Sequence, residues 1–393
     1  MNTAIPPGFE DLVAPMRAAH ERILAHLEAH GLSVAAGPPA EPALALPGNP
    51  EGCAAARAYP IQGVLKYHGM ADWHWRTAFM PSISVNNDAA YTLTLVTFHP
   101  DEADDVVTIG GQVVAGRERE RVVRTLDVVR DLAGIDSRAR VVSQNVVRAA
   151  QTGKGLGTSA SASAALAAAA LAAALGPEIV GNTRLLSATA RLLAGSGCRS
   201  AVGGLSVWLS YPGIPAEESV AVRLDSADEM ADLRLITVPV PSCVGLKTEQ
   251  AHVDAPASSL FRPWMLARGD EILDCADAVW RGDWRRVGQW AELDSVRLHG
   301  VTMSGSMENK LFAWEPENMA LFRLCNTLRD ADVPVYFSTD TGPTTVFLTH
   351  RDHEDALVDA LESEGRDWEV VRGRVAGPAT LVAPDDAMPE LGC

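Results

Sequence analysis

The chain has 393 residues, of which 47% are hydrophobic and 21% charged, and its formal net charge is −17. This length can bury a large core and suggests two domains or lobes. The strong negative charge argues against a nucleic-acid-binding surface, because phosphate backbones are bound by clustered Lys and Arg. An anionic substrate would therefore need a local basic pocket within an acidic protein.

The six cysteines are scattered, and no two of them form a Cys-x-x-Cys pair. Neither a zinc site nor a disulfide framework is predicted, and free thiols fit a reducing cytoplasm. The first residues lack the basic-then-apolar pattern of a signal peptide. The alanine-rich run near the middle of the chain is judged too short and too rich in serine to span a membrane. We therefore expect a cytoplasmic protein that binds neither membrane nor nucleic acid.

Residues 1–50 are predicted to form an appendage. Apolar residues recur at helical spacing over residues 9–30, so an amphipathic helix is expected there. The Ala-, Pro- and Gly-rich stretch over 35–50 is typical of a linker. The sequence does not decide whether this helix packs on the main body or on a second subunit.

Strands dominate the next part of the chain. An apolar run over 59–65 ends in a polar turn, and β-rich segments follow at 82–85 and 90–97. A hairpin is expected over 106–114, a helix over 117–132, and a strand over 139–145. That last strand leads towards a glycine-rich turn.

The glycine-rich turn at 153–163 is the feature around which the chain is organised. Its glycines occupy alternate positions, and the alanine-rich run that follows, ending before Gly176 and Pro177, is typical of a helix. Free N–H groups and the helix dipole favour an anion at such a helix start. The side chains that can add a charge or hydroxyls for a polyphosphate and its magnesium are Lys154, Thr158, Ser159 and Ser161. The alternative is a flexible turn before a close-packed helix.

The second half of the chain contains two further turns that could form a site. A helix over 182–193 precedes a Gly/Ser-rich turn at 194–200, and a strand is expected over 203–209. An apolar strand over 233–240 opens the second lobe, in which helices are expected over 258–281, 284–298 and 317–331. A strand over 333–338 stops at a turn that contains Asp340, and another strand follows at 345–349. The prediction is an α+β fold with lobes at 58–230 and 231–385.

Three single residues could carry chemistry. Lys66 ends an apolar strand, where a lysine ordinarily extends its amine to solvent. Arg199 lies in a turn suited to an anion, since a guanidinium grips a carboxylate or phosphate through two hydrogen bonds; it could equally brace the loop. Asp340 by itself is typical of a plain turn.

Taken together, these residues lie in stretches that resemble the mevalonate diphosphate decarboxylases of the GHMP kinase superfamily. The resemblance covers about residues 59–349 in collinear order, and its stretches are 64–69 (VLKYHG), 155–160 (GLGTSA), 195–200 (GSGCRS), 292–295 (ELDS) with His299, and 340–343 (DTGP). It implies a two-lobed GHMP-kinase-like fold with an extra N-terminal helix. It also implies ATP-dependent decarboxylation of a phosphorylated mevalonate, in which ATP phosphorylates the C3 hydroxyl before phosphate and carbon dioxide leave.

The resemblance also implies roles for individual residues. Asp340 would take or orient the hydroxyl proton, Arg199 would hold the substrate carboxylate, and Lys66 would lie near Asp340 and keep it ionised. The substrate would also contact Tyr67, Ser196 and Thr248. The phosphates of ATP, with magnesium at Ser159, would lie against Lys154, Gly155, Leu156, Gly157, Thr158, Ser159 and Ser161. A homodimer is usual for the family.

Two departures from the family pattern concern the pocket for the substrate's terminal phosphates. The family reads K-Y-W-G-K-R, whereas here Met70 and Ala71 replace the last two cations, and Ala194 replaces a serine in the second turn. A less charged substrate needs fewer contacts, so we expect mevalonate 5-phosphate in place of the 5-diphosphate. His68, His74 or Arg76 could instead restore the lost charge and keep the diphosphate as substrate.

Two other functions are compatible with the same fold. One is a kinase that phosphorylates the C3 hydroxyl without decarboxylation. The other is a regulatory protein that has kept the fold and lost catalysis, a possibility that the N-terminal appendage invites. The presence of Lys66, Arg199 and Asp340 at all three decarboxylase positions argues against both.

Overall fold

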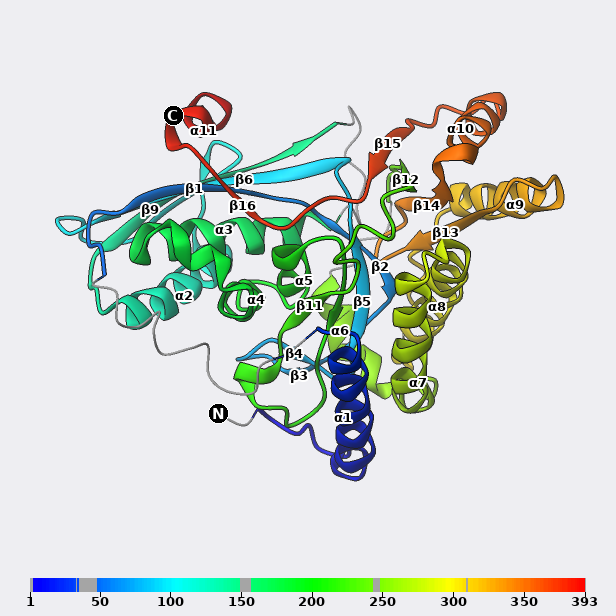
Figure 1. The fold of residues 1–393 in the computed structure, drawn as a ribbon, viewed down its shortest axis with the longest axis horizontal. Helices are drawn as coiled ribbons and strands as arrows, with labels where there is room; N and C mark the ends of the chain where they lie inside the picture. The colour runs from blue at the N-terminus through cyan, green and yellow to red at the C-terminus, as the bar shows by residue number, and fades with distance from the viewer. Residues whose placement is uncertain are drawn as a thin grey trace.

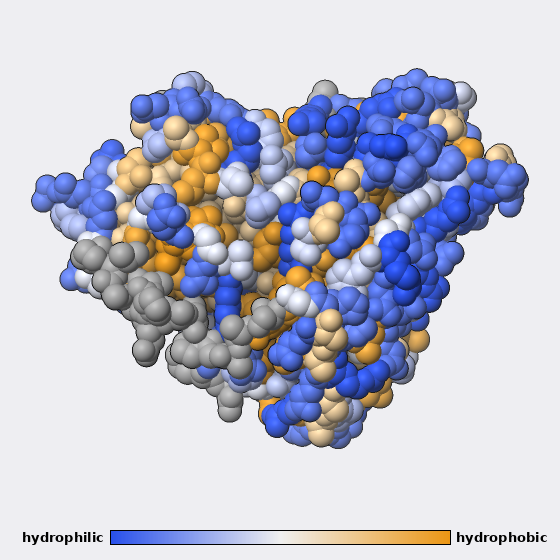
Figure 2. Space-filling model, viewed as in Figure 1, coloured by the Kyte–Doolittle hydropathy of each residue, from blue (hydrophilic) through white to orange (hydrophobic). Residues whose placement is uncertain are grey.

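The computed structural model describes residues 3–32, 34, 48–148, 157–242, 248–308 and 310–392. Two lobes lie side by side (Figure 1). One contains a six-stranded sheet and the alanine-rich helix, and the other contains a four-stranded sheet and most of the long helices. On the face drawn in Figure 2, hydrophilic residues cover most of the right-hand half, where the helices of the second lobe lie.

The first lobe is built on a sheet with the strand order β16-β1-β6-β9-β7-β8. Its strands are β1 (Cys53–Ala58), β6 (Ala90–His99), β7 (Val106–Ile109), β8 (Gln112–Val113), β9 (Arg138–Val147) and β16 (Thr380–Val382). The helices that pack around its core are α2 (Gly116–Ala133), α3 (Thr158–Leu175), α4 (Thr183–Arg191) and α5 (Gly197–Val202).

Helix α3 lies at the centre of this lobe because its side chains are small. It packs against β1 and β6 on one side and against α2, α4 and α5 on the others, and almost all of its residues are buried. Its 18 residues are long and apolar enough to cross a membrane, so the expectation that the run is too short for this was wrong. The helix is 83% buried inside the molecule, as expected for the core helix of a folded lobe.

A second sheet, with the order β11-β10-β5-β2, connects the two lobes. Its strands are β2 (Ile61–Leu65), β5 (Ser82–Asn86), β10 (Leu205–Trp208) and β11 (Ala221–Arg223). Strand β2 contacts both α8 (Trp284–Gly305) and β13 (Val335–Thr339) of the second lobe. Residues that follow β2 are therefore placed at the junction of the lobes.

The second lobe has the strand order β13-β14-β12-β15. Its other strands are β12 (Leu233–Val238), β14 (Thr345–His350) and β15 (Val371–Arg374), and its other helices are α6 (Thr248–Asp254), α7 (Phe261–Trp280), α9 (Pro316–Asp330) and α10 (Glu354–Ser363). Helix α8 packs along β13 and also reaches β2. The chain then returns to the first lobe, where β16 pairs with β1, and ends in α11 (Pro384–Leu391). The lobe limits at 58, 230 and 385 stay predictions.

The N-terminal helix packs on the main body, which settles a point that the sequence left open. It comprises a 3-10 turn, Glu10–Leu12, and α1 (Val13–Ala29), and it lies along α7. Ile23 and Leu27 are buried in the core shared with α7. Arg22 pairs with Asp270 at 2.7 Å on the outside of this contact. Most of the predicted linker lies outside the described residues.

The expected helices and strands are confirmed, with shifted ends. The largest shift is in α8, which runs to Gly305 where the helix was expected to end at 298; the buried Val301 and Thr302 extend its core face. Several short elements were not predicted: β1, β11, β15, β16, α10, α11 and the hairpin of β3 (Met70–Asp72) with β4 (Thr77–Ala78). Strands of two or three residues are too short to show an alternating pattern.

Candidate active site

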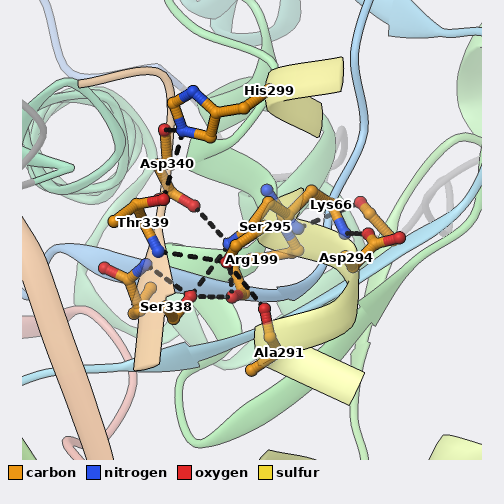
Figure 3. A network of polar contacts seen from close by, with 12 residues as sticks. Lys66, Arg199, Ala291, Asp294, Ser295, His299, Ser338, Thr339 and Asp340 are labelled. Atoms are coloured by element: carbon orange, nitrogen blue, oxygen red, sulfur yellow. Dashed lines mark hydrogen bonds and ion pairs between the residues drawn. The ribbon is translucent and has the colours of Figure 1, made fainter. Parts of the chain in front are cut away.

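Lys66 and Asp340 form an ion pair at the junction of the lobes. Lys66 follows β2 and Asp340 follows β13, and Lys66 Nζ donates to Asp340 Oδ1 at 2.9 Å (Figure 3). Lys66 Nζ also donates to the Gly63 carbonyl at 2.8 Å and to Ser338 Oγ at 2.9 Å. The Lys66 side chain is 2% exposed and that of Asp340 26%. The Lys66 ammonium is therefore fixed, while the Asp340 carboxylate is still accessible to a substrate.

The ion pair of Lys66 and Asp340 lies against Gly63, where the absence of a side chain makes room for it. A Cβ at this position would lie 2.8 Å from Asp340 Oδ1 and 3.1 Å from Lys66 Nζ. The register of β2 against β5 shifts between Gly63 and Leu65. Such an irregularity re-aims the side chain that follows it, here the side chain of Lys66.

Asp294 of α8 anchors the backbone of Lys66. Its fully buried carboxylate accepts the Lys66 backbone N–H at 2.5 Å, the Trp264 indole N–H at 2.9 Å and Arg268 Nη2 at 2.9 and 3.0 Å. A buried charge with this many donors is satisfied within the fold. Asp294 is therefore a positioning residue.

His299 and Ser295, one turn apart on α8, hold the end of β13. His299 Nε2 lies 3.0 Å from the Asp340 carbonyl oxygen and 3.1 Å from Thr339 Oγ1. Because a carbonyl only accepts, Nε2 carries the proton. Burial, and then the charge of Lys66, lower the pKa of His299 to about 3, so the ring is neutral. Ser295 Oγ accepts the Thr339 N–H at 3.1 Å.

Arg199 lies in the same site, and its guanidinium has a donor that no described residue accepts. It is 2% exposed, and its Nη1 donates to Ser82 Oγ at 3.0 Å, while its Nε has no partner among the described residues. Burial lowers the pKa of Arg199, and the negative charge of Asp340 opposes this. A buried guanidinium with free donors can hold a carboxylate through two parallel hydrogen bonds.

Tyr67 lies beside Arg199, with its ring centroid 5.3 Å from the guanidinium carbon. The Ser196 side chain hydrogen-bonds to the phenol of Tyr67. His252 of α6 stacks on the other ring face, with centroids 5.3 Å apart, and accepts the Gly69 N–H at 3.1 Å. The structure thus brings the predicted Tyr67 and Ser196 together and adds His252, which the sequence did not indicate.

The start of α3 has the features of an anion site. Gly157 adopts a left-handed conformation (φ 68°), and a Cβ there would lie 2.4 Å from the Ile61 carbonyl oxygen, so no other residue fits. No side chain caps this helix. Thr158 is half-buried and Ser159 exposed in its first turn, so N–H groups and hydroxyls are available to a phosphate.

The remaining candidate residues are placed differently. Ser161 is fully buried, and its hydroxyl bonds to Thr92 Oγ1 at 2.7 Å and to the Thr158 carbonyl at 3.0 Å; its contact with ATP stays a prediction. Thr248 is the first residue of α6, and its substrate contact also stays a prediction. Lys154, Gly155 and Leu156 lie outside the described residues. The part of the chain that the structure describes contains no cluster of three His, Cys, Asp or Glu side chains suited to a metal ion.

Two of the three possible replacement cations are unsuited to that role. His68 is fully buried, and burial followed by the charges of His252 and His299 lowers its pKa well below the usual value, so it is neutral near pH 7. His74 is exposed and packs edge-on against Trp75. Arg76, between β3 and β4, is the permanently charged member of the set.

Comparisons with known proteins agree with this geometry. Residues 58–221 match the model of the diphosphomevalonate decarboxylase-like N-terminal domain. Over 340 residues the chain is 37% identical to a phosphomevalonate decarboxylase of Haloferax volcanii, covering 85% of this chain and 99% of that protein.

Solved structures show the same fold. A mevalonate diphosphate decarboxylase from Staphylococcus aureus superposes with a TM-score of 0.77 at 29% identity, covering 84% of this chain and 98% of that chain. A related complex with MVAPP, AMPPCP and magnesium superposes with a TM-score of 0.75 at 27% identity, covering 84% and 99%. The expected two-lobed fold and the family resemblance are confirmed, and the chain belongs to the mevalonate decarboxylase family of the GHMP kinase superfamily.

Proposed function

We propose that this protein uses ATP and Mg²⁺ to decarboxylate mevalonate 5-phosphate to isopentenyl phosphate. The observation that carries the proposal is the contact of Lys66 with Asp340 in one site with Arg199. A partly open carboxylate, a fixed ammonium and a guanidinium with free donors are the groups that phosphorylation of a hydroxyl next to a carboxylate requires.

The first step transfers the γ-phosphoryl group of ATP to the C3 oxygen. Asp340 accepts or orients the C3 hydroxyl proton, and Lys66 keeps Asp340 ionised. Arg199 holds the C1 carboxylate, which fixes the substrate relative to Asp340. Phosphoryl transfer depends mainly on positioning and charge neutralisation, and His299, Ser295 and Asp294 supply the positioning of these groups.

The second step is an elimination. The C3–O bond breaks and phosphate leaves, while the electron pair of the C1–C2 bond forms the C2–C3 double bond and releases carbon dioxide. Lys66 and Arg199 stabilise the negative charge that leaves with the phosphate. The buried surroundings of both cations strengthen this stabilisation, because the local dielectric is low.

The start of α3 is the proposed site of the ATP phosphates. Gly157, Thr158 and Ser159 supply N–H groups and hydroxyls, and the predicted residues 154–156 complete the loop. Magnesium, held by the phosphates and the Ser159 hydroxyl, would neutralise charge on the transferred group. The structural relative in complex with AMPPCP and magnesium supports the binding of ATP and magnesium.

The preference for a monophosphate is supported by the pocket beside Tyr67. Met70 and Ala71, which replace two cations of the family pattern, are both 6% exposed and pack as apolar side chains. His68 is neutral and does not restore a charge. The similarity to a protein named phosphomevalonate decarboxylase supports the same substrate. We also propose a cytoplasmic homodimer, as is usual for the family.

The test is a side-by-side assay with ATP and Mg²⁺ on mevalonate, mevalonate 5-phosphate and mevalonate 5-diphosphate, following ADP and carbon dioxide. Both products from the monophosphate, with little from the diphosphate, are expected. A higher kcat/KM for the diphosphate would contradict the proposed substrate. ADP without carbon dioxide would indicate a C3 kinase, and ATP binding without turnover a regulatory protein.

A further inference from the structure

Arg76 is held in a strained backbone conformation. It is one of three non-glycine residues with positive φ in the part of the chain that the structure describes, with φ 53°. Residues other than glycine adopt this conformation at a cost, and such sites cluster at ligand clamps. Arg76 Nε is buried and has no partner among the described residues. Both observations raise the question of what Arg76 binds.

The charge of Arg76 acts on two further half-buried arginines, which belong to α2. Burial lowers the pKa of Arg121 and Arg124, and the charge of Arg76 lowers both further. Among the described residues, none of these three guanidiniums takes part in an ion pair. Arg121 donates to the Leu193 carbonyl, just before the second Gly/Ser turn. Like charges so placed repel one another, and an anion between them would relieve that repulsion.

Nearby acidic groups balance part of the charge of this arginine cluster, Arg76 with Arg121 and Arg124, but among the described residues none of them forms an ion pair with it. Glu249 is paired with Arg117, and Asp72 is buried with its two oxygens on the N–H groups of Trp75 and Ala4, each at 2.8 Å. Glu118, whose charge raises the pKa of Arg121, is exposed on the first turn of α2. The guanidiniums of the cluster therefore stay available to an anion within a protein of net charge −17.

The cluster lies beside the second Gly/Ser turn. Burial raises the pKa of Tyr67, and the charges of Arg199 and Arg76 both act to lower it, so both charges act on this phenol. The backbone oxygen of Arg76 would lie 3.2 Å from a Cβ on Gly195, beside Ser196. A molecule with a carboxylate at one end and a phosphate at the other needs two such cationic ends.

The N-terminal segment braces the hairpin that carries Arg76. Asp72 accepts the Ala4 N–H from this segment. It also accepts the Trp75 N–H, and this second hydrogen bond closes the turn that leads to Arg76. Thr3 bonds to the Ile214 carbonyl through its side chain at 2.7 Å. Arg191 Nε donates to the Trp75 carbonyl at 2.8 Å from the other side. These contacts hold the strained residue in one place.

We propose that Arg76, together with Arg121 and Arg124, binds the single 5-phosphate of the substrate, while Met70 and Ala71 provide no cations for a second phosphate. This inference rests on the proposed function and extends it to specificity. The cluster distinguishes a phosphorylated mevalonate from free mevalonate, while Arg199 holds the carboxylate common to both.

The experiment compares wild type with Arg76→Gly, Arg76→Lys and Arg119→Gln. Glycine adopts a positive φ freely, so Arg76→Gly removes the guanidinium and relieves the strain without disturbing the fold. A charge-assisted hydrogen bond of this kind is worth about 10- to 100-fold. We therefore expect KM for mevalonate 5-phosphate to rise about 10- to 100-fold in Arg76→Gly and less in Arg76→Lys, with the melting temperature maintained.

The control variant Arg119→Gln lies on the same helix, but Arg119 faces Asp104 and the Asp105 carbonyl, away from the cluster, so its kinetics should equal those of wild type. KM for ATP should be unchanged in all variants. A rise in KM for ATP alone would assign the cluster to the nucleotide and overturn the proposal. Wild-type KM for mevalonate 5-phosphate in Arg76→Gly would also overturn it. Failure of wild type to turn over mevalonate 5-phosphate would instead refute the proposed function.

Discussion

Replacement of Asp340 by Asn tests the centre of the proposed mechanism. Asn keeps the shape of the side chain but lacks the negative charge and is a much weaker proton acceptor. A positioned general base contributes about 10²- to 10⁴-fold to the rate. We therefore expect kcat of Asp340→Asn to fall by about 10²- to 10⁴-fold, while the ATP affinity, which we assign to the start of α3, stays the same.

The structure also gives the expected effect of Asp340→Asn on stability. Lys66 loses its one negatively charged acceptor, although the Asn amide oxygen can still accept, and keeps the Gly63 carbonyl and Ser338 Oγ. A hydrogen bond to a charged group contributes about 1.5–3 kcal/mol, and removal of one partner from a fully buried pair costs about 3–5 kcal/mol. Because Asp340 is 26% exposed, the lower range applies. The variant should lose about 1.5–3 kcal/mol of unfolding free energy and remain folded.

The assay measures ADP and carbon dioxide at saturating ATP and substrate, with urea unfolding of the same samples. Ser338→Ala is the matched control, because it removes a neutral acceptor from Lys66 but leaves the carboxylate in place. It should lower kcat by far less than Asp340→Asn does. If Asp340→Asn turned over within about threefold of wild type, Asp340 would have no part in proton transfer and the mechanism would be wrong.

Three further predictions concern other parts of the site. Arg199→Ala should raise KM for the carboxylate-bearing substrate about 10- to 100-fold without changing the ATP affinity; unchanged kinetics would exclude the carboxylate contact. Gly157→Ala, which places a Cβ 2.4 Å from the Ile61 oxygen, should weaken ATP binding in a titration, whereas Gly176→Ala (φ 92°, no atom within 4 Å) should only lower stability. His299 binds its proton only near pH 3 when folded but near 6.5 when unfolded, so unfolding takes up a proton between these values and stability falls as pH falls through them. His299→Gln should reduce this slope by about 1.4 kcal/mol per pH unit near pH 5 in urea titrations, and an unchanged slope would contradict the buried neutral ring.

The fold was predictable where the sequence pattern is long. The alanine-rich run that ends at Gly176 and Pro177 is α3, and the alternating segment after 90 is β6. The β3–β4 hairpin was not predicted, because two strands of two or three residues carry no periodicity. Strand β16 depends on pairing with β1, more than 300 residues earlier in the chain, and local pattern contains no information on such a contact.

The site was predictable through the family resemblance more than through local chemistry. Lys66 and Asp340 each look ordinary in their own segments, and the 2.9 Å contact exists only because β2 and β13 meet. The neutral state of His299 depends on burial that its helix does not reveal. His252 lies in a short helix with no distinctive spacing, and only the fold stacks it on Tyr67.

The acidity of the protein and its anionic substrates are compatible because charge acts locally. At physiological ionic strength the Debye length is about 8 Å, so most of the 50 acidic side chains are screened from a substrate in the site. The charges that remain effective are those fully or partly removed from water: the buried Lys66 and Arg199, and the half-buried arginine cluster with Arg76. A second phosphate group on the substrate would need further cations beside Met70 and Ala71, where the chain provides buried apolar side chains. Selectivity for a monophosphate therefore follows from the positions at which these cations are present, and not from the net charge.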